Sequence, residues 1–261
     1  MEDNNDYTLR AAGSNSRVPK TIMQTWKNED IPEHWLPSIR SIDSILVPNG
    51  WKRVLMTDDD NRRLIQEHFP HFLHTYDNFK YPIQRADAIR ACYLYLYGGV
   101  YSDLDFEVKE DFHDLLTEGS LFLVPSGNIG SMFTNAFMAS APRNPFWLDY
   151  IEEMKKPAPW YALGKHLHVM MTTGPMALSR VASRGNYDIT VLPSDLFTPC
   201  SVCDLNCKAQ EHSYLRQLDG GSWNGADSKM YNWLLCNWWK VLIGVIIVVI
   251  IVLLVLWLSD N

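Results

Sequence analysis

Short apolar runs separated by longer amphipathic segments make up most of the chain, a pattern typical of strands that alternate with helices. Buried strands are predicted at residues 21–26, 51–56, 100–101 and 121–124, and a further apolar segment follows at residues 135–140. Helical spacing marks residues 32–44, 62–68, 83–97, 146–156 and 174–183. This alternation favours an α/β fold in which helices cover both faces of a mixed sheet.

The longest apolar run lies near the C-terminus, where the 18 residues 241–258 carry no charged side chain. As a helix, this run would extend about 27 Å, close to the hydrocarbon thickness of a bilayer. Trp238, Trp239 and Trp257 occupy positions where interfacial aromatic residues are common, and Lys240 marks one edge. The pattern predicts a transmembrane helix at residues 238–258. A buried core helix is the weaker alternative, because no polar face interrupts the run.

The rest of the chain is expected to form one domain, residues 18–237, because its length suits a single core. Residues 1–17 are polar and lack the hydrophobic segment of a signal peptide, and residues 259–261 form a short tail. We therefore expect a protein that a C-terminal helix holds to a membrane. Lys240 beside the span favours a cytosolic position for the domain.

Charge and cysteine content narrow the range of partners. The formal net charge is −7 and no long basic run occurs, which argues against duplex nucleic acid as a ligand. Among five cysteines, Cys200, Cys203 and Cys207 lie close together. With His212 they could form a zinc site, or they could be ordinary loop residues. A disulfide is the alternative if the domain faces an oxidising compartment.

A pair of aspartates follows the long helix 83–97 and carries the strongest chemical signal in the chain. A Gly-Gly turn and a short strand lead from this helix to Asp103 and Asp105. Acidic oxygens at the end of a strand lie where open α/β sheets bind ligands. They suit a hard divalent cation, which often shares its coordination shell with substrate phosphates. The pattern therefore indicates a metal-assisted phosphate site.

Two further charged residues belong to the same block. Asp87 and Arg90 are three residues apart on the preceding helix and therefore share one face. They are expected to join the aspartates in the site, and the alternative is a solvent-exposed ion pair. The acidic triplet at residues 58–60 is instead expected to cap a helix.

This arrangement resembles the sugar-binding region of DXD-type glycosyltransferases, in particular the Och1-type and inositol phosphorylceramide mannosyltransferases of glycosyltransferase family 32. Residues 18–26 look like the opening Pro-Lys-x-Ile-x-Gln-x-Trp strand of that family, with Met23 where the family often has His. Thr-Gly-Pro at residues 173–175 and Gly-Ser-Trp at residues 221–223 look like its later landmarks. The block at residues 87–105 is the most specific part of the resemblance.

The resemblance covers residues 19–227 and implies a GT-A-type nucleotide-sugar-binding fold with a mixed central sheet. It implies a divalent cation, Mn²⁺ or Mg²⁺, held by Asp103 and Asp105, with His212 or Asn224 as a further ligand. The residues that it implies for catalysis are Asp87, Arg90 and Asp105. The residues that it implies for donor binding are Gln24, Trp26, Asp87, Arg90, Asp103, Asn135, Gly174, Pro175, Ser222 and Trp223.

The implied reaction is metal-dependent transfer of mannose from GDP-mannose to a lipid such as inositol phosphorylceramide, by front-face attack with retention of anomeric configuration. A glycoprotein glycan mannosyltransferase, a UDP-sugar transferase and a non-catalytic, membrane-anchored sugar-nucleotide-binding protein remain alternatives. A haloacid-dehalogenase-type phosphatase is disfavoured, because Glu107 stands where that class has Thr or Val. The family resemblance implies that the domain lies in an endomembrane lumen, that of the Golgi, whereas Lys240 favours the cytosolic side. Both locations of the domain therefore remain alternatives.

Overall fold

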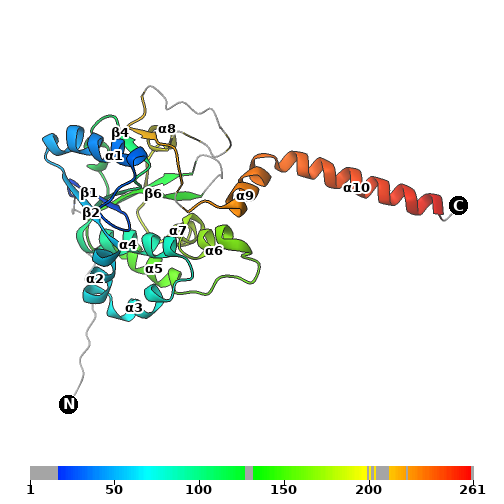
Figure 1. The fold of residues 1–261 in the computed structure, drawn as a ribbon, viewed down its shortest axis with the longest axis horizontal. Helices are drawn as coiled ribbons and strands as arrows, with labels where there is room; N and C mark the ends of the chain where they lie inside the picture. Colours follow the sequence, from blue (N-terminus) through cyan, green and yellow to red (C-terminus); the bar gives the residue numbers. More distant parts are fainter. Residues whose placement is uncertain are drawn as a thin grey trace, which may run out of the picture.

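The computed structural model describes residues 17–126, 132–198, 200, 203, 212–221 and 223–259. Its centre is a six-stranded sheet with the order β2-β1-β3-β6-β5-β7, flanked by helices (Figure 1). Strands β2, β1 and β3 are parallel, β6 is antiparallel to both β3 and β5, and β7 is parallel to β5, so the sheet is mixed, as predicted. The strands are β1 (Thr21–Thr25), β2 (Lys52–Met56), β3 (Gly99–Ser102), β5 (Leu121–Pro125), β6 (Phe133–Ser140) and β7 (Thr190–Val191).

A second, two-stranded sheet lies next to the central one. It pairs β4 (Phe106–Val108) with β8 (Leu215–Gln217) in antiparallel register. Only residues 103–105 separate β3 from β4, so the acidic segment forms the turn between the two sheets. This position fixes the acidic residues at the point where one sheet ends and the other begins.

Helices fill most of the remaining chain. The segment predicted as helical at residues 32–44 is helical from residue 33 on, but it consists of a 3-10 turn, an α-helix and a π-helical turn in succession. Pro37 lacks an N–H group and stands in the first turn of the α-helical part, where no hydrogen bond is lost. The α-helices are α1 (Leu36–Ser41), α2 (Asp58–His68), α3 (Pro70–Asp77), α4 (Pro82–Tyr97), α5 (Pro145–Met154), α6 (Gly164–Thr172), α7 (Pro175–Ala182), α8 (Ser194–Phe197), α9 (Ala226–Cys236) and α10 (Trp238–Ser259). The short helices are η1 (Glu33–Trp35), the π-helical η2 (Ile42–Leu46), η3 (Val47–Asn49) and η4 (His113–Leu116).

Helix α2 begins with the acidic triplet. The Thr57 Oγ1 accepts a hydrogen bond from the Asp60 N–H at 3.2 Å, and the Asp60 carboxylate accepts one from the Thr57 N–H at 3.0 Å. This reciprocal pair is a capping box, which satisfies two backbone donors at the helix start. The triplet therefore lies at a helix start, as predicted, but the helix begins at Asp58 and not at Arg62, and its N-cap is Thr57 with Asp60 completing the capping box.

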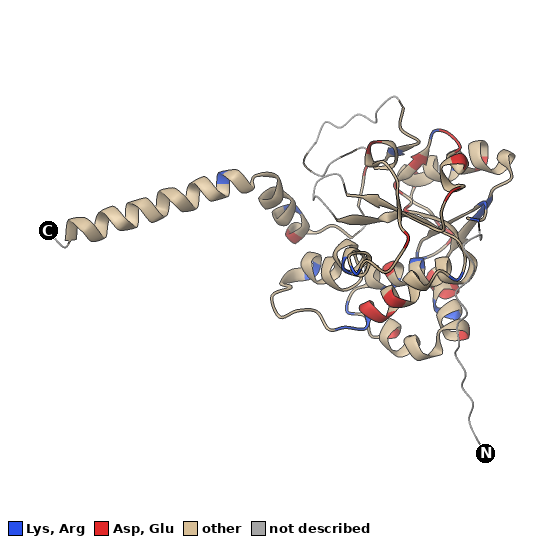
Figure 2. Cartoon of the chain, turned by 180° about the vertical axis from the view of Figure 1, so that it is seen from behind, with Lys and Arg blue, Asp and Glu red and all other residues tan. Residues whose placement is uncertain are grey.

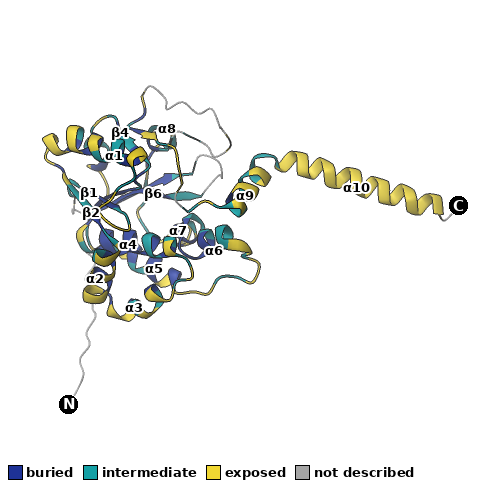
Figure 3. Ribbon diagram, in the orientation of Figure 1, coloured by how far each residue is buried: buried dark blue, intermediate teal, exposed yellow. Residues whose placement is uncertain are grey.

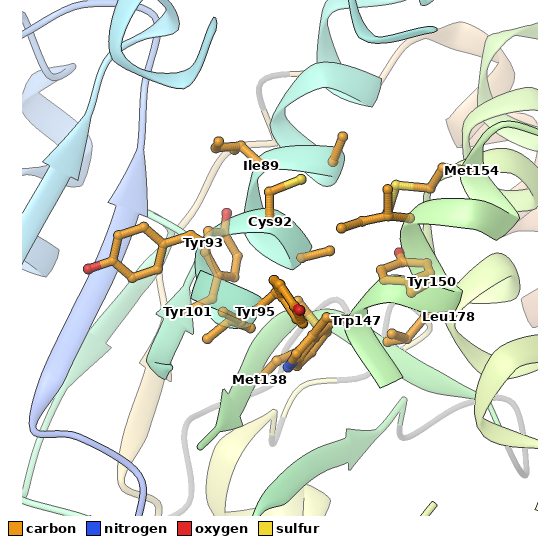
Figure 4. Packing of buried hydrophobic residues seen from close by; sticks show 14 of the residues in the cluster. Ile89, Cys92, Tyr93, Tyr95, Tyr101, Met138, Trp147, Tyr150, Met154 and Leu178 are labelled. Atoms are coloured by element: carbon orange, nitrogen blue, oxygen red, sulfur yellow. The ribbon is translucent and has the colours of Figure 1, made fainter. Parts of the chain in front are cut away.

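Buried apolar residues lie on both faces of the central sheet (Figure 3). Successive residues of a strand point to opposite faces, so Val100 enters one cluster and Tyr101 the other. Tyr101 packs in the cluster that α4 and α5 cover, together with Trp147 and Tyr150 (Figure 4). The core therefore holds β3 and α4, the two elements that carry the acidic motif, in one rigid unit.

The Gly-Gly turn between α4 and β3 requires glycine at both positions. Gly98 has φ +64° and Gly99 has φ +91°, a region that residues with a Cβ rarely adopt. A Cβ atom at Gly99 would lie 2.5 Å from the carbonyl oxygen of Thr21 in β1. The turn thus brings β3 against β1 more closely than any side chain would allow.

We expect Gly99→Ala to lower the free energy of unfolding by about 2 kcal/mol or more, since backbone strain of this kind costs roughly 1–3 kcal/mol and the clash adds to it. Gly50→Ala is the matched control, because Gly50 also has positive φ (+86°) but would place its Cβ in open space. Thermal unfolding of the full chain in detergent micelles measures both. Equal destabilisation by the two substitutions would show that the close contact between residue 99 and the Thr21 carbonyl adds nothing to the cost of positive φ.

Helix α10 contains the apolar run predicted to span a membrane. It has 22 residues with a mean hydropathy of 3.6 over its most apolar window, and none of that window is buried against the domain. Apart from Lys240 the helix carries no charged residue (Figure 2). Its length and composition fit a single-pass membrane anchor.

Cys203 and Cys236 form a disulfide, with a Cα–Cα distance of 5.3 Å. A cysteine held in a disulfide cannot supply a thiolate to zinc, so the zinc-site interpretation fails at Cys203. Cys207 lies outside the described residues, and Cys92 is a buried free thiol. The disulfide joins the end of α9 to a residue 33 positions earlier in the chain.

Candidate active site

The site lies where the parallel strands β1 and β3 end. Asp103 directly follows β3, and its backbone N–H donates to the Ala136 carbonyl at 2.8 Å. The Gln24 Nε2 of β1 donates to the Asp103 carbonyl at 3.3 Å and to the Ser38 hydroxyl at 2.9 Å. Gln24 is therefore buried beneath the site and braces the backbone of Asp103, in place of the predicted contact with the donor.

Asp105 is positioned by the second sheet. Its carbonyl oxygen accepts the Leu218 N–H at 2.6 Å, which extends the β4–β8 pairing by one step. Leu104 between the two aspartates is buried, and all three residues line the same pocket. The turn thereby presents both aspartates toward one pocket.

Arg90 from α4 connects the acidic residues. Its Nη2 lies 3.2 Å from the Asp103 Oδ1 and 3.3 Å from the Asp87 Oδ1, and its Nη1 donates to the Asn135 carbonyl at 2.8 Å. The guanidinium also stacks on the Tyr101 ring, 4.6 Å from its centroid. Arg90 and Asp87 are 5% and 3% exposed, so the alternative of a solvent-exposed ion pair is wrong.

Asp87 lies behind Arg90 and does not line the pocket. Its two carboxylate oxygens accept hydrogen bonds from the Asn135 Nδ2 at 3.0 Å and from the Thr173 Oγ1 at 2.8 Å. Burial raises the pKa of Asp87 to about 6, although Arg90 and Thr173 favour the charged form. With its oxygens occupied in this way, Asp87 holds Arg90 in place.

The pocket has a cavity volume of about 360 Å³ and lies between the strand ends, α4, α6 and the segment before α9. Trp26 and Trp35 meet edge to face on its wall, with ring centroids 5.0 Å apart. The Lys165 Nζ donates to the Trp223 carbonyl at 2.8 Å and so joins α6 to that segment. The predicted residues that line it are Trp26, Arg90, Asp103, Asp105, Trp223 and Asn224.

The other predicted residues lie elsewhere. Asn135 is buried between Asp87 and Arg90, and Gly174 with Pro175 starts α7, where the Gly174 carbonyl accepts a hydrogen bond from the Tyr150 hydroxyl. Neither group lines the pocket. Ser222 lies outside the described residues.

His212 is not brought to the carboxylates. It is exposed and precedes β8, six residues before Leu218, which pairs with Asp105. At roughly 3.3 Å per residue, six extended residues span up to about 20 Å. His212 also does not line the pocket that Asp103 and Asp105 face, so the structure does not group it with them.

The residues present fit a hard divalent cation. The Asp105 Oδ1 is buried and has no hydrogen-bond partner among the residues that the structure describes. Burial raises the pKa of Asp105 to about 8, and the negative charge of Asp103 adds to this shift. An unpartnered carboxylate oxygen beside a second carboxylate, with the Asn224 amide on the same wall, is a donor set that Mg²⁺ or Mn²⁺ would satisfy.

Three residues of the site, Tyr101, Lys165 and Trp35, were not identified as site residues from the sequence. Tyr101 donates its hydroxyl hydrogen to the Asp103 Oδ1 and supports the guanidinium of Arg90. Its position two residues before Asp103 on a strand places it on the same face as Asp103, so period-two alternation could have identified it. Lys165 and Trp35 reach the pocket only through tertiary packing, and no local pattern marks them.

The fold and the site together define a glycosyltransferase. A family model described as "Glycosyltransferase sugar-binding region containing DXD motif" matches residues 32–122, which include Arg90, Asp103 and Asp105. A solved structure, the ligand-free glycosyltransferase domain from the YGT toxin, superposes with a TM-score of 0.50 over 68% of this chain and 81% of that one. Its sequence identity is 8%, so this likeness concerns the GT-A fold alone.

Curated relatives define the family more narrowly. Inositol phosphoceramide mannosyltransferase 1 of Schizosaccharomyces pombe is 30% identical over 247 residues, covering 93% of this chain and 73% of the relative. Mannosyl phosphorylinositol ceramide synthase SUR1 of Saccharomyces cerevisiae is 36% identical over 213 residues, covering 82% and 53%. The chain belongs to the DXD glycosyltransferase family that includes these proteins, as its sequence motifs predicted. It spans about half the length of the second relative.

Proposed function

We propose that this chain transfers mannose from GDP-mannose to inositol phosphorylceramide at a membrane surface, with a divalent cation and with retention of anomeric configuration. The observation that carries the proposal is the Asp105 Oδ1, which has no hydrogen-bond partner among the described residues and belongs to a side chain that lines a pocket beside the Arg90–Asp103 pair. Mannose and the lipid acceptor are supported by the names of the relatives, which describe mannosyl transfer to this lipid class, and GDP as the nucleotide is what the family resemblance implies.

Asp103 and Asp105 would hold the cation, with the Asn224 amide oxygen as a further ligand. When bound, such a cation neutralises the diphosphate of the donor and acts as a Lewis acid. Tyr101 and Arg90 fix the Asp103 carboxylate in a single orientation, so this ligand is preorganised before the donor arrives. We infer that Mn²⁺ and Mg²⁺ both suit this donor set.

Arg90 would stabilise charge that develops on the leaving phosphate. A buried guanidinium held by Asp87, Asp103 and the Asn135 carbonyl needs little reorganisation during the reaction. Asp87 acts through Arg90 as a positioning residue. Trp26 and Trp223 offer flat faces on the pocket wall for the base and the sugar.

We propose that the domain faces the lumen of an endomembrane compartment, the Golgi. Disulfides persist in oxidising compartments and are rare in the cytosol. The Cys203–Cys236 disulfide next to α10 therefore supports a luminal position over the cytosolic one that Lys240 favours. A lipid acceptor agrees with α10 as an anchor, because both confine the reaction to a bilayer.

Incubation of the purified full chain with Mn²⁺ and a panel of GDP- and UDP-sugars tests the proposal, with inositol phosphorylceramide as the acceptor in mixed micelles. Mass spectrometry is expected to show one added hexose on the lipid with GDP-mannose. Transfer from a UDP-sugar would overturn the donor assignment, and transfer only to a glycoprotein glycan would overturn the acceptor. Absence of transfer from every donor, by protein that unfolds cooperatively on heating, would favour a non-catalytic binding protein.

A further inference from the structure

Large apolar side chains are exposed beside the anchor helix, on the side of the domain from which α10 projects (Figure 1). We call this set the aromatic patch. Its members and their exposed fractions are Trp160 (90%), Tyr161 (50%), Leu163 (67%), Met230 (52%), Trp233 (56%) and Leu234 (37%). Single exposed apolar residues are common, but a contiguous group of this size marks an interaction surface.

The two halves of the aromatic patch are joined. On α9, Met230, Trp233 and Leu234 follow i, i+3, i+4 spacing and therefore form one stripe. The opposite face of α9 packs on α6, where the buried Ser228 hydroxyl lies 3.1 Å from the His166 Nδ1. The Tyr231 hydroxyl donates to the Leu163 carbonyl at 3.2 Å and so fixes the loop before α6 to α9.

The aromatic patch is held close to the bilayer, because almost no linker separates the domain from the anchor. Helix α9 ends at Cys236 and α10 begins at Trp238, with only Asn237 between them. The Cys203–Cys236 disulfide also ties the end of α9 to the chain before β8. A domain attached so closely cannot turn this face far from the membrane surface.

We propose that the aromatic patch is a bilayer-docking surface, and that α9 with the loop 157–163 lies in the headgroup region when α10 spans the membrane. Trp and Tyr favour this interface because their rings combine an apolar body with a polar edge. Lys229 on α9 and Lys240 at the start of α10 add positive charge that suits anionic headgroups. The occupant is therefore a lipid surface that continues from the anchor helix.

Docking of the aromatic patch would also position the pocket close to the membrane surface. Lys165 and Trp223 line the pocket and belong to the same α6–α9 unit, in which the Trp223 ring stacks on the His166 ring at 5.3 Å. Immersion of the patch therefore brings the pocket wall to the level at which lipid headgroups lie. This consequence rests on the proposed lipid acceptor, whereas the docking itself rests only on the anchor and the patch.

Spin labelling of the full chain in vesicles of phosphatidylcholine and phosphatidylinositol tests the docking. Trp160→Cys and Glu67→Cys each receive a nitroxide, and the unsubstituted chain is treated in parallel to correct for native cysteines. Glu67 is the matched control, because it is exposed on α2, across the domain from α10 (Figure 1). We expect oxygen to relax the label at position 160 more strongly than a water-soluble nickel complex does, and the reverse at position 67. Dominance of the nickel complex at both positions would overturn the proposal.

A functional measurement separates docking from catalysis. Trp160→Ser combined with Leu163→Ser is expected to raise the KM for vesicle-embedded acceptor several-fold, while hydrolysis of the donor in water stays unchanged. Neither residue lines the pocket. Unchanged KM would count against docking. Loss of hydrolysis together with transfer would show that the patch supports the fold of the site, and would overturn its assignment as a separate docking surface. If the chain transfers no sugar at all, the spin-label result still decides the docking.

Discussion

Asp105→Asn is expected to lower the rate of sugar transfer by at least about a hundredfold, because removing one preorganised electrostatic contact from an active site has an effect of this size. The fold is expected to stay intact. Within the described part of the chain the Asp105 Oδ1 has no hydrogen-bond partner, so the substitution breaks no hydrogen bond of that atom there. It also removes a carboxylate whose pKa is raised to about 8 by burial and by Asp103. The variant should therefore unfold at the same temperature as the parent or at a higher one when no metal is added.

Transfer assays and thermal unfolding of the full chain in detergent micelles measure both halves of this prediction. Asp114→Asn is the matched control, because Asp114 is exposed and lies in η4, away from the pocket. The control should keep full transfer. Parent-like transfer by the Asp105 variant would rule out its carboxylate as a metal ligand, and a large loss of stability would mean that it has a structural role instead.

Arg90→Met is expected to cost about 3–5 kcal/mol of stability, the usual penalty when one partner of a buried ion pair is removed. The substitution would leave Asp87 and Asp103 without their shared cation in a site where burial already raises the pKa of both carboxyl groups. Arg90→Lys keeps the charge but loses the planar fork that reaches Asp87, Asp103 and the Asn135 carbonyl together. We expect this second variant to fold and to lose at least about tenfold in transfer, because a compact ammonium cannot reproduce that geometry.

A surface pair provides the comparison for Arg90. Arg53 forms a two-point ion pair with Asp43, but their side chains are 28% and 48% exposed. Such exposed pairs contribute roughly 0–1 kcal/mol, so Arg53→Met should have little effect on unfolding. If Arg90→Met were as mild as Arg53→Met, the buried network would not be what holds the site together.

The parts of the site that lie close together in sequence could be predicted. The helix, the Gly-Gly turn and the short strand stand next to Asp103 and Asp105, so local rules for helix ends and strand alternation place the carboxylates correctly. The apolar pattern likewise predicted the mixed sheet and the long apolar helix α10. The segment at residues 135–140 was assigned only as apolar, and it is the eight-residue strand β6.

The supports of the site depend on long-range packing that local spacing does not encode. Asn135 and Thr173 meet Asp87 across 48 and 86 residues of sequence, and their hydrogen bonds occupy both oxygens of a carboxylate that the resemblance assigned to the sugar. His212 was chosen for its chemistry, but the register of β4 with β8 sets Leu218 beside Asp105 instead. The Cys203–Cys236 disulfide was likewise missed, because the local cluster of cysteines suggested partners near in sequence.

If Asp103 and Asp105 bind a nucleoside diphosphate through a divalent cation, GDP should bind tightly only when both the cation and the carboxylates are present, and titration calorimetry measures this. GDP is titrated into the full chain with Mn²⁺ and with chelator, and into the Asp105→Asn variant with Mn²⁺. We expect binding by the parent with Mn²⁺, and affinity at least about tenfold weaker in the other two titrations, as for loss of a charged ligand in a buried site. Equal GDP affinity in all three titrations would show that neither the cation nor the Asp105 carboxylate contributes to binding of the diphosphate.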